Sequence, residues 1–157
     1  MKLRRIGFGI LLLPFVLIAL MILYEVFGMT VNHTASARQT QNATNILKMK
    51  LSSVEILDRY TETGNTSGTG NHVDMLTTVI FRTEAELEEI QQALQDYDGL
   101  DEWSFRIESL EKAQAAREQY PGVNAFLEKM DIPENLNHCW LLYLNTSAPF
   151  PDNIEGH

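Results

Sequence analysis

The sequence is dominated by one apolar segment near its amino terminus. Between Ile6 and Phe27, 18 of 22 positions are hydrophobic, and the 19 residues from Ile6 to Tyr24 carry no charge. At about 1.5 Å of rise per residue, 22 helical residues span about 33 Å, enough to cross the hydrocarbon core of a bilayer. We therefore expect residues 6–27 to form a transmembrane helix that contacts the lipid bilayer.

The charges that flank this segment predict its orientation. Lys2, Arg4 and Arg5 precede it, and the next basic residue in the chain is Arg38. Positively charged flanks stay on the cytoplasmic side of a membrane helix. Residues 1–5 are therefore expected to be a short cytoplasmic tail at the plasma (inner) membrane, and the rest of the chain is expected to be extracytoplasmic.

A cleaved signal peptide is the alternative interpretation of the same segment. The apolar region of a signal peptide usually spans about 7–15 residues and closely precedes a small-residue A-x-A site. Here the apolar run is longer, and the best such site, Ala35-Ser36-Ala37, lies well beyond its end. The sequence favours an uncleaved signal anchor over a secreted domain that begins at Arg38.

The remainder of the chain is acidic and contains one cysteine. Residues 28–157 hold 9 basic and 20 acidic side chains, a net charge of −11. Nucleic-acid binding is not expected, because it depends on basic side chains that neutralise phosphates. Cys139 alone cannot form an internal disulfide framework or a cysteine-rich zinc site. Within its apolar run it is expected to be a buried core residue, with an intermolecular disulfide as the alternative.

Composition divides the expected exported part into three segments. Residues 28–45 are rich in Thr, Asn, Gln and Ser and predict a polar linker. Residues 46–147 suffice for one α+β domain, and residues 148–157 are expected to be a flexible tail. The predicted domain is an antiparallel or mixed sheet of three or four strands with two or three helices on one face.

Strand and helix signals alternate within this domain. Apolar alternation and β-branched content predict strands in 46–60, 73–82 and 139–144, the last of them central in the sheet. A glycine-rich loop over 64–71 is expected to join the first two as a hairpin. Alternation over 103–107 fits a short strand, and a helix that begins near Asp101 is the alternative. Helices are predicted over 84–97, after a capping box at Thr83 and Glu86, and over 110–120 and 123–130.

Candidate catalytic or metal-binding residues are few. His72 and Asp74 would share one strand face and could form an imidazole–carboxylate pair, and His138 lies beside Cys139. A catalytic zinc usually has three protein ligands, and only two are visible locally. A solvated loop edge is the better explanation of His72 and Asp74, so no catalytic residue is assigned.

The acidic run from Asp96 to Glu102 resembles part of a calcium-binding loop. With Asp96 as the first position of such a loop, the fifth, sixth and twelfth positions are Leu100, Asp101 and Ile107, and all three fail the pattern. No G-x-S-x-G or phosphate-binding loop motif occurs either. The sequence therefore predicts no metal ligand, no cofactor-binding residue and no cofactor.

Four N-x-[ST] sequons begin at Asn32, Asn42, Asn65 and Asn145. Such tripeptides are common by chance in a chain rich in Asn, Ser and Thr. They matter only in a cell that glycosylates exported proteins.

These observations favour a single-pass membrane protein whose exported domain is a non-catalytic interaction or regulatory module. Its expected partner is another membrane or extracytoplasmic protein. The alternatives are a ligand sensor and a membrane-tethered hydrolase or divalent-cation-dependent enzyme that uses His72, Asp74, His138 or the acids of 96–102. Convergence of the two histidines and Asp74 in one pocket would favour the enzyme, and an exposed apolar patch would favour partner binding.

Overall fold

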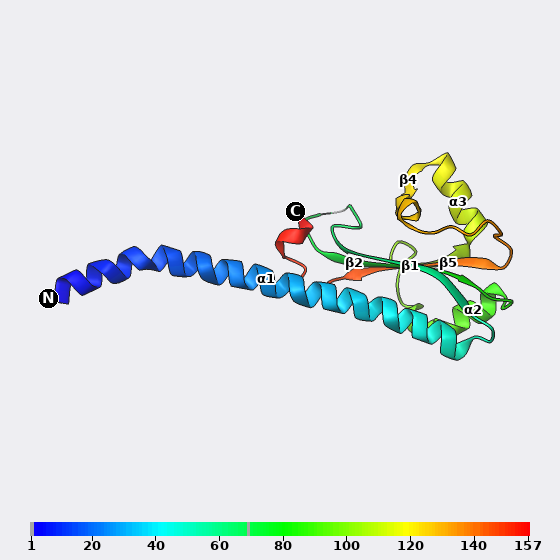
Figure 1. Cartoon of the computed structure of the whole chain (residues 1–157), viewed down its shortest axis with the longest axis horizontal. Coiled ribbons are helices and arrows are strands. Elements are labelled where there is room, and N and C mark those ends of the chain that lie inside the picture. Colours follow the sequence, from blue (N-terminus) through cyan, green and yellow to red (C-terminus); the bar gives the residue numbers. More distant parts are fainter. Residues whose placement is uncertain (1, 69) are drawn as a thin grey trace.

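The computed structural model describes residues 2–68 and 70–157, with side chains from residue 12 onward. Helix α1 (Lys2–Lys50) includes 49 of these residues and projects far beyond the rest of the chain (Figure 1). Within Leu12–Lys50, an 18-residue window has a mean hydropathy of 2.3 and is 6% buried. Length and composition therefore suit a membrane span, and a signal sequence near the N-terminus shares these properties.

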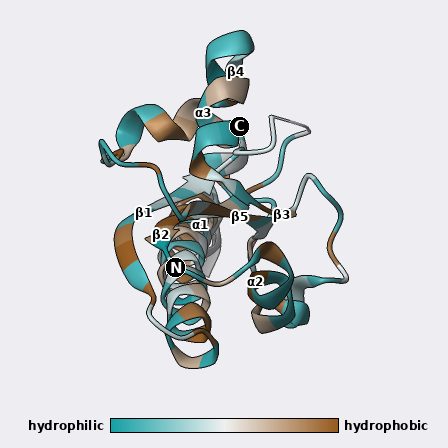
Figure 2. Ribbon diagram, turned by 90° about the vertical axis from the view of Figure 1, so that its right-hand side faces the viewer, coloured by the Kyte–Doolittle hydropathy of each residue, from teal (hydrophilic) through white to brown (hydrophobic). Residues whose placement is uncertain are grey.

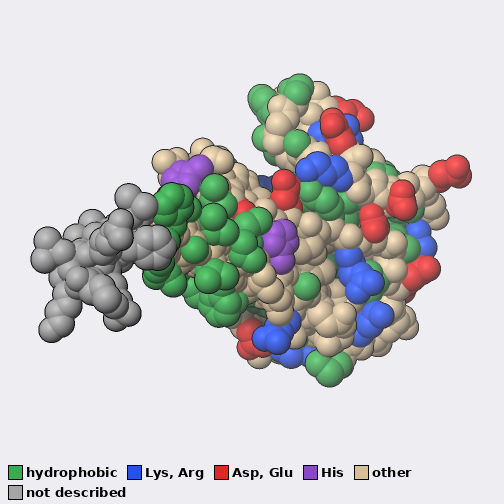
Figure 3. Space-filling model, turned by 60° about the vertical axis from the view of Figure 1, so that its left-hand side comes forward, with side chains coloured by type: hydrophobic (Ala, Val, Ile, Leu, Met, Phe, Trp, Pro, Cys, Tyr) green, Lys and Arg blue, Asp and Glu red, His purple; other side chains and the backbone are tan. Residues whose placement is uncertain are grey.

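Two halves of α1 have opposite environments. Large apolar side chains from Leu12 to Phe27 are exposed, and Figure 3 shows hydrophobic side chains gathered on the projecting part of the molecule. Farther along, α1 packs on the domain with one stripe of small polar and apolar side chains, made of Asn32, Ser36, Thr40, Ala43, Thr44 and Leu47. Residues 28–45 are thus part of a packed helix instead of the expected linker. Their polar composition conceals a buried stripe with helical spacing.

Four strands form one antiparallel sheet within the described part of the chain. They are β1 (Glu55–Gly64), β2 (Asp74–Arg82), β3 (Phe105–Ser109) and β5 (Cys139–Ser147), in the order β1-β2-β5-β3. The predicted hairpin of β1 and β2 is confirmed, and so is the interior position of β5. The strand expected to begin at residue 46 begins at Glu55, because residues 46–50 continue α1.

Helices cover both faces of the sheet rather than one. The remaining elements are α2 (Leu87–Ala93), η1 (Gln95–Tyr97), α3 (Leu110–Gln119), β4 (Pro121–Asn124), η2 (Ala125–Lys129) and η3 (Ile154–Gly156). In Figure 2, α1 and α2 lie on one side of the strands and α3 on the other. The prediction of one covered face missed the second layer because it treated the polar half of α1 as linker.

Strand β2 shows why both faces are covered. Eight of its nine residues are buried, so apolar side chains point to both sides. Val79 and Phe81 pack with α1 and α2, whereas Leu76 and Ile80 pack with α3 and η2. A strand buried on both faces needs a layer on each of them.

The predicted capping box does not form at the start of α2. The helix begins at Leu87 with Glu86 as its N-cap, and no side chain caps it. The Thr83 hydroxyl accepts a hydrogen bond from Ala85 N at 3.2 Å and thus stabilises a turn before the helix. Local hydrogen bonding by threonine competes with helix capping at such positions.

A hydroxyl network joins α1 to the sheet. Thr40 Oγ1 lies 2.7 Å from Thr61 Oγ1 on β1 and 2.8 Å from Thr77 Oγ1 on β2. Next to it, Gln39 donates to Met75 O at 3.0 Å and accepts from Thr146 Oγ1 at 2.6 Å. Three strands are therefore tied to one helical turn by buried or half-buried polar contacts.

Replacing Thr40 with valine tests the contribution of this network. Valine keeps the β-branched shape but leaves the Thr61 and Thr77 hydroxyls without this partner. We expect the free energy of unfolding to fall by about 1–3 kcal/mol, as for a buried group that loses its hydrogen bond. Urea titration of the full chain in detergent micelles, followed by circular dichroism, measures the change.

Thr34→Val is the matched control, because Thr34 is exposed on the same helix and its hydroxyl donates to the Thr30 carbonyl of that helix. Its effect should stay within about 0.5 kcal/mol. Equal losses of unfolding free energy for the two variants would contradict a stabilising role for the Thr40 hydroxyl network.

Candidate functional site

The structure brings His72 and Asp74 together at the start of β2. His72 Nε2 lies 3.0 Å from Asp74 Oδ1, and the side chains are 34% and 6% exposed. Asp74 Oδ2 also accepts a hydrogen bond from Ser67 N at 3.2 Å. The carboxylate therefore orients the imidazole and holds the loop between β1 and β2.

A groove runs past this pair over the part of the sheet that α3 leaves uncovered. One compartment, of about 740 Å³, is lined by His72, Asp74 and residues of β5. A second, of about 460 Å³, extends towards η2. Both compartments are lined by Thr66, Ser67, Trp103 and Tyr143. We call the two together the Trp103 groove.

Trp103 and Tyr143 give this groove its aromatic character. Trp103 is 75% exposed, unusual for so large an apolar side chain, whereas Tyr143 is half-buried in the groove floor. Burial raises the pKa of Tyr143, so its hydroxyl stays protonated at neutral pH. The Arg106 guanidinium lies 4.4 Å from the Tyr143 ring centroid and donates to Asn124, which fixes the floor.

His138 lies at the opposite end of the sheet from this groove. It precedes β5 and lies 3.5 Å from Glu84, whereas His72 lies near the other end of β2. The Asp74–Ser147 pair and the Arg82–Cys139 pair are eight residue steps apart along β2, about 27 Å of strand. The structure therefore does not bring His72, Asp74 and His138 into one pocket.

The acidic run also has structural roles. Asp101 Oδ1 accepts hydrogen bonds from Trp103 N at 3.0 Å and Ser104 N at 2.8 Å, and so shapes the loop that presents Trp103. Asp96 lies 3.6 Å from Lys50. Among the described residues, no group of three or more His, Cys, Asp or Glu side chains could hold a metal ion.

Cys139 and two of the sequons are buried. Cys139 is 2% exposed within the core beside α3, as the sequence predicts. Asn32 and Asn145 are 0% and 7% exposed, so their side chains are inaccessible in the folded domain. Asn42 and Asn65 are exposed.

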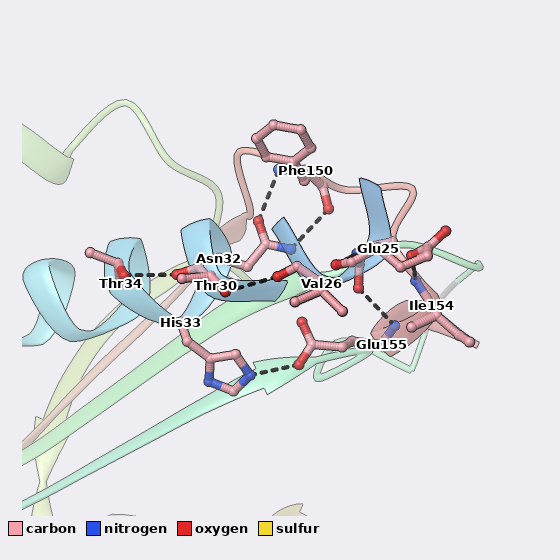
Figure 4. Close-up of polar contacts among 10 residues, drawn as sticks. Glu25, Val26, Thr30, Asn32, His33, Thr34, Phe150, Ile154 and Glu155 are labelled. Atoms are coloured by element: carbon pink, nitrogen blue, oxygen red, sulfur yellow. Dashed lines mark hydrogen bonds and ion pairs between the residues drawn. The ribbon is translucent and has the colours of Figure 1, made fainter. Parts of the chain in front are cut away.

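A second, unexpected arrangement lies where the chain end meets α1. The segment 148–157 docks on α1 instead of forming the expected flexible tail. Asn32 donates to Phe150 O and accepts from Phe150 N, both at 2.9 Å (Figure 4). Asn153 donates to Glu25 O at 2.9 Å, and the Glu25 carboxylate accepts from Ile154 N at 3.0 Å.

Close packing accompanies these hydrogen bonds. The Phe150 ring makes edge contacts with Tyr24 and Phe27, at centroid distances of 6.0 and 5.6 Å. A Cβ atom on Gly28 would lie only 2.7 Å from Asn153 Nδ2, and Asn153 is 1% exposed. The bare glycine backbone therefore lets the chain end approach the helix. The sequence does not predict this contact, because neither α1 nor residues 148–157 carry a local pattern that indicates the other segment.

Comparison of the chain with known protein families, with curated proteins and with solved structures found no match.

Gly28→Ala tests whether docking of residues 148–157 depends on this close approach. The added methyl group would displace Asn153 and weaken its bond to α1. Loss of about 1 kcal/mol of local stability would make the amides of Phe150 and Ile154 exchange about fivefold faster. Hydrogen exchange of the full chain in micelles, read by mass spectrometry, measures this change.

Gly99→Ala serves as the control, because nothing lies within 4 Å of a Cβ at Gly99. It should leave exchange in 148–157 unchanged. If exchange is also unchanged in Gly28→Ala, the close approach at Gly28 contributes little to the stability of the docked segment.

Proposed function

We propose that this protein is a single-pass membrane protein whose exported acidic domain binds another protein and catalyses no reaction. The continuity of α1 carries the proposal. One helix has an exposed apolar half, Leu12–Phe27, and a second half buried against the sheet from Asn32 to Leu47. Such a helix would hold the domain rigidly at the plasma (inner) membrane, with residues 1–5 cytoplasmic.

The buried contacts of α1 support an uncleaved anchor. Cleavage after Ala37 would remove Asn32 and Ser36, which are both 0% exposed in the domain. It would also remove Glu25, which holds the chain end. Cleavage would therefore remove part of the packing of the folded domain, which favours an uncleaved helix.

The Trp103 groove is the surface best suited to a protein partner. It is concave and lined by Leu100, Trp103 and Val123, which are all exposed. Exposed tryptophans at the centre of a docking surface often contribute most of the binding energy. The separation of His72 from His138 supports a binding role over a hydrolytic one.

A cysteine on α2 tests the topology. Leu87 is 36% exposed and far along the chain from α1's apolar half, whereas native Cys139 is buried. In intact cells that express the full chain, Leu87→Cys should react with a membrane-impermeant maleimide, and the wild-type chain should not. The labelled chain should also stay with membranes at alkaline pH. Labelling only after lysis would overturn the orientation, and alkaline release would overturn the anchor.

Crosslinking in native membranes tests the groove. Trp103→Ala is expected to remove most of the captured partner, since loss of a central tryptophan costs about 2 kcal/mol or more of binding energy. Tyr120→Ala is the matched control, because Tyr120 is 60% exposed and does not line the groove. Equal capture by both variants would rule out the groove as the docking surface.

A small-ligand sensor is the second candidate, favoured by the buried carboxylate of Asp74 beneath the larger compartment. The full chain, purified in mild detergent, would then carry a bound mass in native mass spectrometry. Retention of this mass by Tyr120→Ala and its loss from Trp103→Ala would support the sensor. Loss from both variants, or no bound mass in the wild-type chain, would count against it.

A further inference from the structure

The depth of residues 148–157 relative to the proposed membrane span can be derived from their contacts with α1. Ile6–Tyr24, the uncharged run, is about 28 Å long as a helix, close to the thickness of a bilayer core. Glu25 therefore lies at the boundary between hydrocarbon and headgroups. Asn153 and Ile154 bond to Glu25, and Phe150 contacts Tyr24 and Phe27. The chain end is thus held at headgroup level.

The side chains that this segment presents suit that depth. Ile154 is 60% exposed, and Phe150 is partly exposed beside Tyr24 and Phe27, which are 51% and 59% exposed. Aromatic residues favour the membrane interface. An exposed isoleucine next to an exposed apolar helix extends the same apolar surface, and exposed apolar surface of this kind marks an interaction site.

Several backbone groups of the segment form hydrogen bonds within the protein and do not depend on water. Asn32 satisfies both the N–H and the carbonyl of Phe150, and Glu25 accepts from Ile154 N. Val73 N donates to Pro151 O at 2.7 Å. Burying unsatisfied backbone groups near lipid is costly, and these bonds remove that cost for the groups of Phe150, Pro151 and Ile154 that they satisfy.

We propose that residues 148–157 form an interfacial collar that rests in the lipid headgroup region, with Phe150 and Ile154 against the acyl-chain boundary. The collar fixes the depth and tilt of the domain at the membrane. It contains two acids, Asp152 and Glu155, and Glu155 is paired with His33 at 2.6 Å. A zwitterionic surface therefore suits it better than an anionic one. This inference rests on the membrane span proposed above.

Spin labels at three positions test the collar in phosphatidylcholine vesicles that contain the full chain. The label is placed singly at Ile154→Cys in the collar, at Leu17→Cys in the apolar half of α1 or at Leu87→Cys on α2. Collision rates with oxygen, which partitions into lipid, and with an aqueous nickel chelate report the depth of each label. The wild-type chain, whose Cys139 is buried, measures background labelling.

The collar predicts that the label at 154 collides with the nickel chelate severalfold less than the label at 87, and with oxygen less than the label at 17. A label at 154 as accessible to nickel as that at 87, with the label at 17 in lipid, would overturn the collar and leave the anchor standing. A label at 17 accessible to nickel would overturn the anchor. Adding Gly28→Ala to Ile154→Cys should raise the nickel collision rate if docking on α1 sets the depth, and no rise would contradict that.

Discussion

The burial of a polar stripe of α1 against the sheet is the interaction on which the rest of the structure depends. Burying hydroxyl and amide groups costs free energy unless each finds a partner. Here Thr40 meets hydroxyls from β1 and β2, and Gln39 bonds to β2 and β5. The partners come from three strands, so α1 seats correctly only on a sheet with this strand order and register. Helix position and sheet register therefore specify each other.

The groove and the chain end share one short piece of backbone. His72 lines the groove through its side chain, while a Cβ on Gly156 would lie 2.7 Å from the His72 carbonyl carbon. The next residue, Val73, exchanges hydrogen bonds with Ala148 and Pro151. An occupant of the groove and the docked segment 148–157 therefore contact the same turn. This turn is a direct physical connection between the proposed partner surface and the proposed membrane contact.

Much of the domain could be predicted from local pattern. The β1–β2 hairpin, α3 and the interior strand β5 follow from alternation, composition and a continuous apolar run. Local pattern does not predict the polar half of α1 or the docked end 148–157, because their stability comes from partners far away in sequence. Asn32 and Phe150 are separated by 118 residues. Of the candidate site, the His72–Asp74 pair follows from spacing. For Trp103 the alternation over residues 103–107 is misleading, because β3 begins only at Phe105 and Trp103 lies in the turn before it.

The spacing of the buried stripe on α1 has a mechanical consequence. Ser36, Thr40 and Thr44 recur every four residues, so a shift of α1 by four residues, about 6 Å along its axis with a rotation of about 40°, would bring another hydroxyl near Thr61 and Thr77. The hydroxyls of the stripe alone would therefore permit a shifted position of α1. Other contacts exclude that position, because a shift would put alanine in the place of Gln39, break the Asn32–Phe150 pair and withdraw Leu47 from its apolar surroundings. The docked chain end is therefore one of the contacts that fix the position of α1 along its own axis.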